Sequence, residues 1–162
     1  MLVLGTMSSV ASSVSAITIS SPAFSPGAEI PAKYTCNGQS LSPELRISDA
    51  PAAAKSIALV VEDPDAPSGL FTHWLVWNIS PQTAKFAENG APADALQGTN
   101  DFSKRGYGAP CPPSGTHRYI FKVFALDQPL ELKAGARRTQ FDSAIKGHVI
   151  AQAELVGRYG HK

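Results

Sequence analysis

Histidine, tyrosine and aspartate side chains gather in two short segments of this sequence, one around Asp63 and His73 and the other around His117 and Tyr119. His117 and Tyr119 are two residues apart at the start of an apolar run, so a strand would project both to one face and Arg118 to the other. Histidine supplies a proton donor or a positive charge near neutral pH, and tyrosine supplies a hydroxyl donor. The pair therefore predicts a small site for phosphate or carboxylate oxygens, while Arg118 is expected to form a structural ion pair.

The residues Cys111, Pro112 and Pro113 lie just before His117. Prolines have a fixed φ and no amide hydrogen, so we expect a rigid wall beside the anion site. Asp63 has more than one interpretation. It can bond nearby backbone amides in an Asx turn, or it can orient a histidine tautomer or accept a hydrogen bond from an ammonium group next to a phosphate.

Enzymatic interpretations have less support. The sequence has no GxSxG, P-loop or GxGxxG pattern. Asp63, His73 and His117 contain the donors of a two-histidine, one-carboxylate metal site, but no HxD or HExxH spacing supports one. Cys111 and His117 could act as the nucleophile and base of a hydrolase. We expect no catalytic residue, metal or cofactor, and we keep the Cys111-dependent hydrolase as a less favoured alternative.

Strands must hold these side chains in place. We predict buried strands from the apolar runs at residues 55–62, 73–79 and 118–126. A short opening strand is predicted at residues 17–20. The alternation of apolar and polar residues at 149–159 predicts a strand with one solvated face. Residues 136–146 predict a helix that ends at Gly147, and residues 80–113 are rich in loops. The sequence therefore predicts a mainly β fold, a β-sandwich with long loops and one or two peripheral helices.

Composition narrows the function further. The 162 residues include 13 Gly and 13 Pro, which favours many turns, and carry a formal charge of +1, which excludes a basic nucleic-acid footprint or a polybasic membrane anchor. No apolar run is long enough for a membrane helix. Cys36 and Cys111 are either one disulfide or two buried thiols. We expect a flexible leader at residues 1–15 and one domain at residues 16–162. We expect the protein to lie in the cytoplasm, or to be exported if residues 1–16 act as a signal peptide.

The chain resembles the phosphatidylethanolamine-binding protein family, also called Raf kinase inhibitor-like proteins, and looks most like its bacterial and archaeal branch. The resemblance is carried by Asp63-Pro64-Asp65-Ala66-Pro67, His73-Trp74 and Pro112-Pro113-Ser114-Gly115-Thr116-His117-Arg118-Tyr119, in that order. Weaker similarity extends from about Ile17 to Tyr159.

This resemblance implies a β-sandwich around a large central sheet, with an anion pocket at one end of the strands. The pocket positions correspond to Asp63, His73, Cys111, Pro112, Pro113, His117 and Tyr119. It further implies a non-enzymatic binding or regulatory protein for phosphate, acetate or the phosphoryl head group of phosphatidylethanolamine, with a kinase or protease as partner. The alternative is inhibition through a surface loop such as residues 89–103, independently of the pocket. Whether the chain is a monomer or a homodimer stays open.

Overall fold

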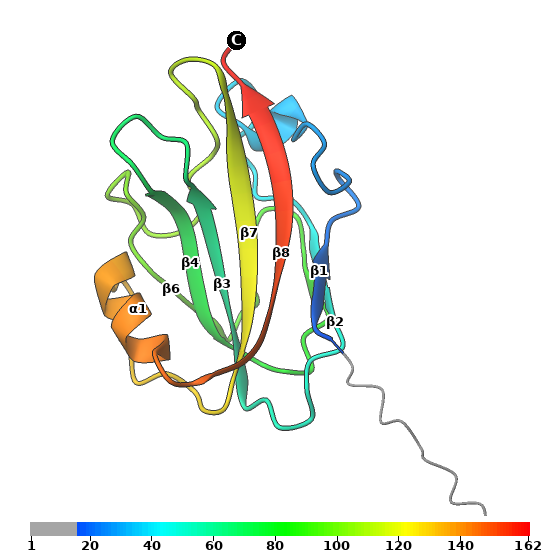
Figure 1. The fold of residues 1–162 in the computed structure, drawn as a ribbon, viewed down its shortest axis with the longest axis vertical. Coiled ribbons are helices and arrows are strands. Elements are labelled where there is room, and N and C mark those ends of the chain that lie inside the picture. Colours follow the sequence, from blue (N-terminus) through cyan, green and yellow to red (C-terminus); the bar gives the residue numbers. More distant parts are fainter. Residues whose placement is uncertain (1–15) are drawn as a thin grey trace, which may run out of the picture.

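Two antiparallel sheets form a sandwich in the computed structural model, which describes residues 16–162 (Figure 1). The smaller sheet has the order β1–β2–β5, with strands at Thr18–Ser20, Leu45–Ser48 and Lys85–Phe86. The larger sheet has the order β6–β4–β3–β7–β8, with strands at Leu96–Gln97, Phe71–Ile79, Ser56–Asp63, Thr116–Leu126 and Val149–Gly160. A 3-10 helix at Ala32–Tyr34 and the α-helix α1 at Arg138–Ile145 complete the described elements. The predicted mainly β fold is confirmed, and the expected leader at residues 1–15 lies outside the described residues.

The strand β3 lies in the middle of the larger sheet, and all eight of its residues are buried. Leu59 and Val61 pack in the core between the two sheets, whereas Ala58 and Val60 pack in a second cluster on the other face. That second cluster includes Phe141 of α1, so the helix covers the outer face of the sheet. Burial on both faces explains why this strand reads as a continuous apolar run.

Ion pairs of a buried glutamate hold α1 against the sheet. Glu62 of β3 is 3% exposed and forms ion pairs with Lys122 of β7 and with Arg138 of α1, the latter at 2.8 Å. Arg138 also donates a hydrogen bond to Thr72 Oγ1 of β4 at 3.2 Å. The register between β3 and β4 shifts between Val61 and Glu62. These contacts place Glu62 on the helix side of β3, and its neighbour Asp63 on the opposite side.

The predicted elements correspond to β1, β3, β4, β7, α1 and β8. After α1, Gly147 has a φ of +80°, a left-handed conformation that favours glycine and ends the helix. Two further strands, β5 and β6, lie in the region that was predicted to be loops. Each has only two residues, which is too short for a periodic pattern.

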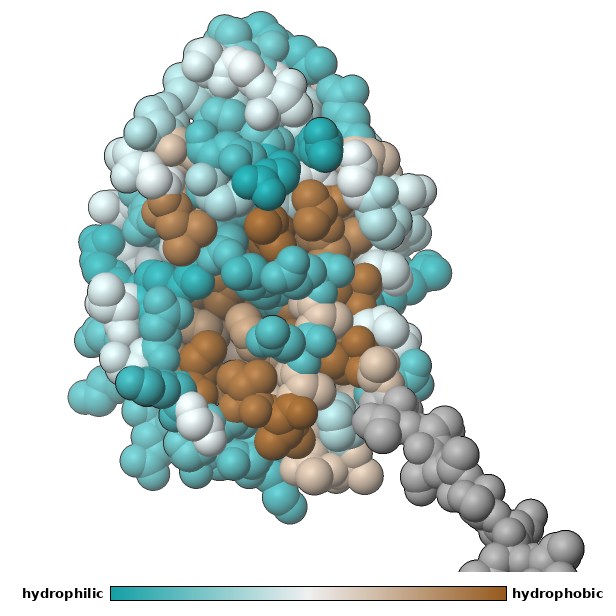
Figure 2. All heavy atoms as spheres, viewed as in Figure 1, coloured by the Kyte–Doolittle hydropathy of each residue, from teal (hydrophilic) through white to brown (hydrophobic). Residues whose placement is uncertain are grey.

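The surface is mixed in character on the face that carries β8 and α1. Hydrophobic residues reach this surface in patches that hydrophilic residues separate (Figure 2). Val149 and Ile150, at the start of β8, are among the exposed hydrophobic residues. Within residues 16–162, no helix combines the length and apolar character needed to cross a membrane.

Candidate functional site

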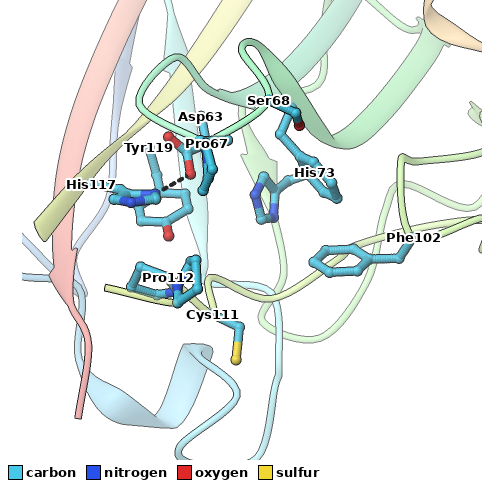
Figure 3. A pocket seen from close by; sticks show the side chains of 12 residues that line it. Asp63, Pro67, Ser68, His73, Phe102, Cys111, Pro112, His117 and Tyr119 are labelled. Atoms are coloured by element: carbon cyan, nitrogen blue, oxygen red, sulfur yellow. Dashed lines mark hydrogen bonds and ion pairs between the residues drawn. The ribbon is translucent and has the colours of Figure 1, made fainter. Parts of the chain in front are cut away.

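A cavity of about 250 Å³ lies where β3 ends and β4 and β7 begin (Figure 3). Its lining includes all seven residues that the sequence singled out: Asp63, His73, Cys111, Pro112, Pro113, His117 and Tyr119. Five further residues line it: Ala66, Pro67, Ser68, Phe71 and Phe102. The structure thus brings the predicted residues together, while their role in binding a ligand stays a prediction.

The antiparallel pairing of the strands explains this convergence. Asp63 is the last residue of β3 and pairs with Phe71 at the start of β4, so His73 follows two residues further along that strand. On its other side β3 pairs with β7, where Glu62 lies opposite Ile120. The start of β7, with His117 and Tyr119, therefore lies beside the end of β3.

Asp63 and His117 form a buried pair at the centre of the site. His117 Nδ1 lies 2.6 Å from Asp63 Oδ2, and the two side chains are 8% and 5% exposed. The second carboxylate oxygen, Oδ1, accepts a hydrogen bond from the backbone N–H of Asp65 at 2.8 Å. Asp63 therefore forms the Asx turn and orients the histidine at the same time, so two of its predicted interpretations hold together.

His73 is held by two hydrogen bonds to one residue. Its Nδ1 lies 2.7 Å from the carbonyl oxygen of Gly108, and its own carbonyl oxygen accepts the Gly108 N–H at 2.8 Å. Burial lowers the pKa of His73 even though the Gly108 hydrogen bond and the carboxylates of Asp63 and Asp101 act against this. The ring is therefore neutral near pH 7.

Aromatic rings enclose the His73 side chain. Its ring centroid lies 5.0 Å from that of Phe71, 5.4 Å from Phe102 and 5.2 Å from Tyr119, the last two in edge-to-face contact. Burial, followed by the nearby charge of Asp63, raises the pKa of Tyr119, so its hydroxyl stays protonated and can donate a hydrogen bond. One side of the cavity is thus aromatic and the other side carries the Asp63–His117 pair.

Arg118 anchors the turn that follows Asp63. Its Nε and Nη2 lie 2.9 Å and 2.8 Å from the two carboxylate oxygens of Asp65, and its backbone N–H donates to the same carboxylate at 2.9 Å. These hydrogen bonds lower the pKa of Asp65 to about 2. The prediction that Arg118 forms a structural ion pair is confirmed, and this pair ties the turn bearing Pro67 and Ser68 to β7.

The wall formed by Cys111, Pro112 and Pro113 is covalently attached to another part of the chain. A disulfide joins Cys111 to Cys36. The alternative of two buried thiols is therefore wrong, and the hypothesis of a Cys111 nucleophile does not fit, because this sulfur carries no free thiol. The carbonyl oxygen of Pro112 also accepts a hydrogen bond from His161 Nδ1 at 3.0 Å.

Phe71 and Phe102 are the aromatic lining residues that sequence reasoning missed. Phe71 lies two residues before His73 and shares its face of β4. The predicted strand began at His73; if it had begun at Phe71, the alternation of a strand would have placed Phe71 beside His73. Phe102 lies in an irregular loop, where no periodic signal exists. Phe102 is 43% exposed, so it provides a large hydrophobic surface at the cavity.

The cavity can offer hydrogen bonds but little fixed charge. Among the described residues that line it there is no lysine or arginine, and Asp63 is the one carboxylate. Across residues 16–162, no group of three or more His, Cys, Asp or Glu side chains is placed to hold a metal ion. Besides the Asp63 carboxylate, the polar side-chain groups that line the cavity are therefore two imidazoles, one phenol and the Ser68 hydroxyl.

Known proteins are similar to this chain in sequence and in fold. A family model described as phosphatidylethanolamine-binding protein matches residues 20–160. The UPF0098 protein PH1269 of Pyrococcus horikoshii is 49% identical over 141 residues, which cover 82% of this chain and 71% of that protein. The UPF0098 protein of Chlamydia trachomatis is 47% identical over 146 residues, which cover 87% of this chain and 97% of that protein.

Two crystal structures are similar to the whole sandwich. The phosphatidylethanolamine-binding protein homologue CT736 of Chlamydia trachomatis has a TM-score of 0.87 and 46% identity, covering 91% of this chain and 99% of its own. Escherichia coli YbcL, described as a new member of the mammalian PEBP family, has a TM-score of 0.84 and 30% identity, covering 90% and 99%. Together with the match over residues 20–160, these likenesses show that the chain belongs to the phosphatidylethanolamine-binding protein family.

Proposed function

We propose that this protein is a non-enzymatic binding protein whose cavity takes a small phosphoryl or carboxylate group. The observation that carries the proposal is the buried Asp63–His117 pair, which lines the same cavity as Tyr119 and His73. An imidazolium held by a carboxylate on one nitrogen can donate from the other nitrogen to an anion. The Tyr119 hydroxyl can supply a second donor to the same anion.

The size of the cavity favours a head group over a complete lipid. Its volume of about 250 Å³ falls below the range of roughly 300–1,000 Å³ that encloses drug-sized ligands. Phe102, which lines the cavity and is partly exposed, offers apolar contact to a substituent that extends out of it. The name of the family, which refers to a phospholipid with a phosphoryl head group, supports a ligand of this kind.

The absence of enzymatic activity is part of this proposal. Of the described residues that line the cavity, Cys111 has its sulfur bonded in the disulfide with Cys36, and Ser68 forms no hydrogen bond with either cavity histidine. A nucleophile activated by an adjacent base is the usual requirement for covalent catalysis. Regulation of a kinase or protease, through the occupied pocket or through the loop at residues 89–103, stays a prediction.

Titration of the isotope-labelled protein with phosphoethanolamine and with acetate, followed by NMR, tests the proposal. We expect saturable shifts of the His73 and His117 ring signals. In the variant His117→Ala, affinity should fall about tenfold or more, because a charge-assisted hydrogen bond contributes roughly 1.5–3 kcal/mol. The matched control is His148→Ala, since His148 pairs with Asp127 at the surface and does not line the cavity. If neither ligand moves the His73 or His117 signals, the pocket assignment fails.

A further inference from the structure

The cysteine–proline wall of the cavity is attached to the rest of the molecule by few hydrogen bonds. Three of the residues 109–113 are prolines, which have no N–H to donate. Within residues 16–162 this segment has two hydrogen bonds to other parts of the chain. The Cys36 N–H donates to the Pro110 carbonyl at 3.1 Å, and His161 Nδ1 donates to the Pro112 carbonyl at 3.0 Å. The disulfide is therefore the covalent tie that holds the wall in place.

The disulfide lies at the surface, beside a second cavity. Both Cys36 and Cys111 are exposed. The second cavity has a volume of about 420 Å³, is lined by both cysteines and shares Cys111 and Phe102 with the ligand cavity, so the two cavities are neighbours. Cys36 does not line the ligand cavity, and Figure 3 shows the Cys111 sulfur directed away from Asp63 and His117. A small reagent can therefore reach the disulfide without entering the ligand cavity.

The charge of the second cavity favours sulfur chemistry. Lys104 lines it, and none of the described residues that line it is an acid. A nearby cation favours the thiolate, which is the form in which a thiol attacks a disulfide and the form in which a cysteine is displaced. Exposed disulfides are the labile and regulatory ones, whereas structural disulfides resist reduction. The Cys36–Cys111 disulfide thus combines access from solvent with a setting that suits exchange.

We propose that the Cys36–Cys111 disulfide is a site of thiol–disulfide exchange with a small dithiol, and that its reduction releases the wall and weakens ligand binding in the first cavity. A thiolate of the dithiol attacks one sulfur of the disulfide, forms a mixed disulfide and displaces the other cysteine as a thiolate. The second thiol then attacks the mixed disulfide, and the reductant leaves as a cyclic disulfide. Its two electrons and two protons end on the two cysteines, which become thiols. The exchange is independent of the proposed anion-binding function, and only the effect on affinity rests on that function.

The disulfide and the ligand influence each other in both directions. Cys111, Pro112 and Pro113 line the ligand cavity, so a ligand that contacts them binds the tied wall better than the released wall. Linkage then requires that the ligand protects the disulfide from reduction by the same factor by which reduction weakens ligand binding. Coupling between two sites is typically about 5- to 150-fold. We expect the lower end, about fivefold, because His117 and Tyr119 stay in place on β7.

Dithiothreitol added to the native wild-type protein tests the exchange. Alkylation of the free thiols followed by mass spectrometry measures the rate of reduction in native buffer and in concentrated urea. We expect the native rate to lie within about tenfold of the rate in urea, because the disulfide is exposed. After reduction, amide hydrogen exchange should be faster at Cys36, whose N–H bonds to Pro110. It should be unchanged at Asp65, whose N–H bonds to Asp63 in the turn after β3.

Cys36→Ser is the matched variant, because it breaks the disulfide without changing a residue that lines the ligand cavity. Phosphoethanolamine is titrated into the oxidised wild type, the reduced wild type and Cys36→Ser, and binding is followed by NMR at His117 and Tyr119. The reduced wild type and Cys36→Ser should bind about fivefold more weakly than the oxidised wild type, and dithiothreitol should have no effect on Cys36→Ser. Saturating phosphoethanolamine should raise the ratio of reduced to oxidised dithiothreitol at half-reduction of the wild type by the same factor.

Each outcome has a defined meaning. Reduction that proceeds only in urea would overturn the exchange site, as would unfolding of the wild type on reduction. Equal acceleration of amide exchange at Cys36 and Asp65 would overturn the local release of the wall. Equal affinity of the oxidised and reduced wild type would overturn the effect on ligand binding, and this comparison decides that point even if Cys36→Ser does not fold. If phosphoethanolamine shifts no signal in any form, the proposed function fails, while the reduction rates and the amide exchange still decide the exchange site.

Discussion

Replacing Asp63 by asparagine should lower the stability of the protein and change which nitrogen of His117 carries its proton. In the wild type, one carboxylate oxygen accepts from the Asp65 N–H at 2.8 Å and the other lies 2.6 Å from His117 Nδ1. An asparagine that keeps its oxygen toward Asp65 turns its amide N–H₂ toward His117. Nδ1 must then accept, which moves the histidine proton to Nε2, the nitrogen that faces the cavity.

The size of the stability loss follows from the burial of the pair. The Asp63 and His117 side chains are 5% and 8% exposed, so solvent screens their interaction little. A hydrogen bond involving a charged group contributes roughly 1.5–3 kcal/mol and a neutral one about 0.5–1.5 kcal/mol, so Asp63→Asn should cost about 1–2 kcal/mol. For a domain of this size, that corresponds to a fall in Tm of roughly 2–8 °C.

Binding should change less than stability. The Asp63 carboxylate holds a proton on His117 Nδ1 in the wild type. In Asp63→Asn that proton moves to Nε2, so the ring can still donate to a ligand. Affinity for inorganic phosphate should therefore fall less than in His117→Ala, which removes the donor altogether.

Thermal unfolding and phosphate titrations of the wild type, Asp63→Asn and His117→Ala would measure both effects. The matched control is Asp127→Asn, which alters a second Asp–His pair at 2.8 Å whose partners are 47% and 33% exposed. An exposed pair contributes about 0–1 kcal/mol, and its loss should leave phosphate binding unchanged. If Asp63→Asn melts like the wild type and binds phosphate as weakly as His117→Ala, the assignment of Asp63 as the group that sets the His117 tautomer is refuted.

Three further changes should have separable effects. Arg118→Gln removes the two hydrogen bonds from the guanidinium to Asp65, so we expect little change in stability but faster amide exchange in the 65–69 turn. Unchanged exchange there would contradict the anchoring role. Cys111→Ala removes a disulfide between residues 75 apart, for which the chain-entropy relation gives a loss of about 4.5 kcal/mol. Urea unfolding under non-reducing conditions would measure this loss, and an unchanged midpoint would be evidence against the disulfide. Because burial lowers the pKa of His73, the unfolded state binds a proton more readily than the native state, and stability falls as the pH drops below the ordinary value of 6.5. The wild type should therefore lose more stability than His73→Gln between about pH 7.5 and 5.5, and equal losses would count against burial of the ring.

The parts of the fold that depend on local alternation were predictable from the sequence. The i, i+2 spacing of His117 and Tyr119 placed both on the cavity side of β7 and Arg118 on the other, because successive strand residues face opposite ways. The continuous apolar character of β3 likewise indicated a strand that is covered on both faces.

What the sequence did not reveal depends on contacts between distant segments. The disulfide joins cysteines 75 residues apart, and no spacing rule relates them. Phe102 reaches the cavity because the loop around it is folded by Asn100, whose side chain accepts from the N–H groups of Phe102 and Lys104 and donates to the Gly106 carbonyl. A buried asparagine in such a loop has no periodic signature. The same is true of the His73–Gly108 bond, which fixes a tautomer through a residue 35 positions away.

The adjacency of Glu62 and Asp63 makes the large sheet sensitive to changes in chain length. The first carboxylate meets Lys122 and Arg138 under α1, and the second meets His117 in the cavity. Adding or removing one residue in β3 would exchange the two sides, because the side-chain period of a strand is two. Glu62 would then enter the ligand cavity and Asp63 would be left beneath the helix. Such an indel should therefore be tolerated far less well than a conservative substitution at either position, which gives this strand a different mutational signature from the surface loops around it.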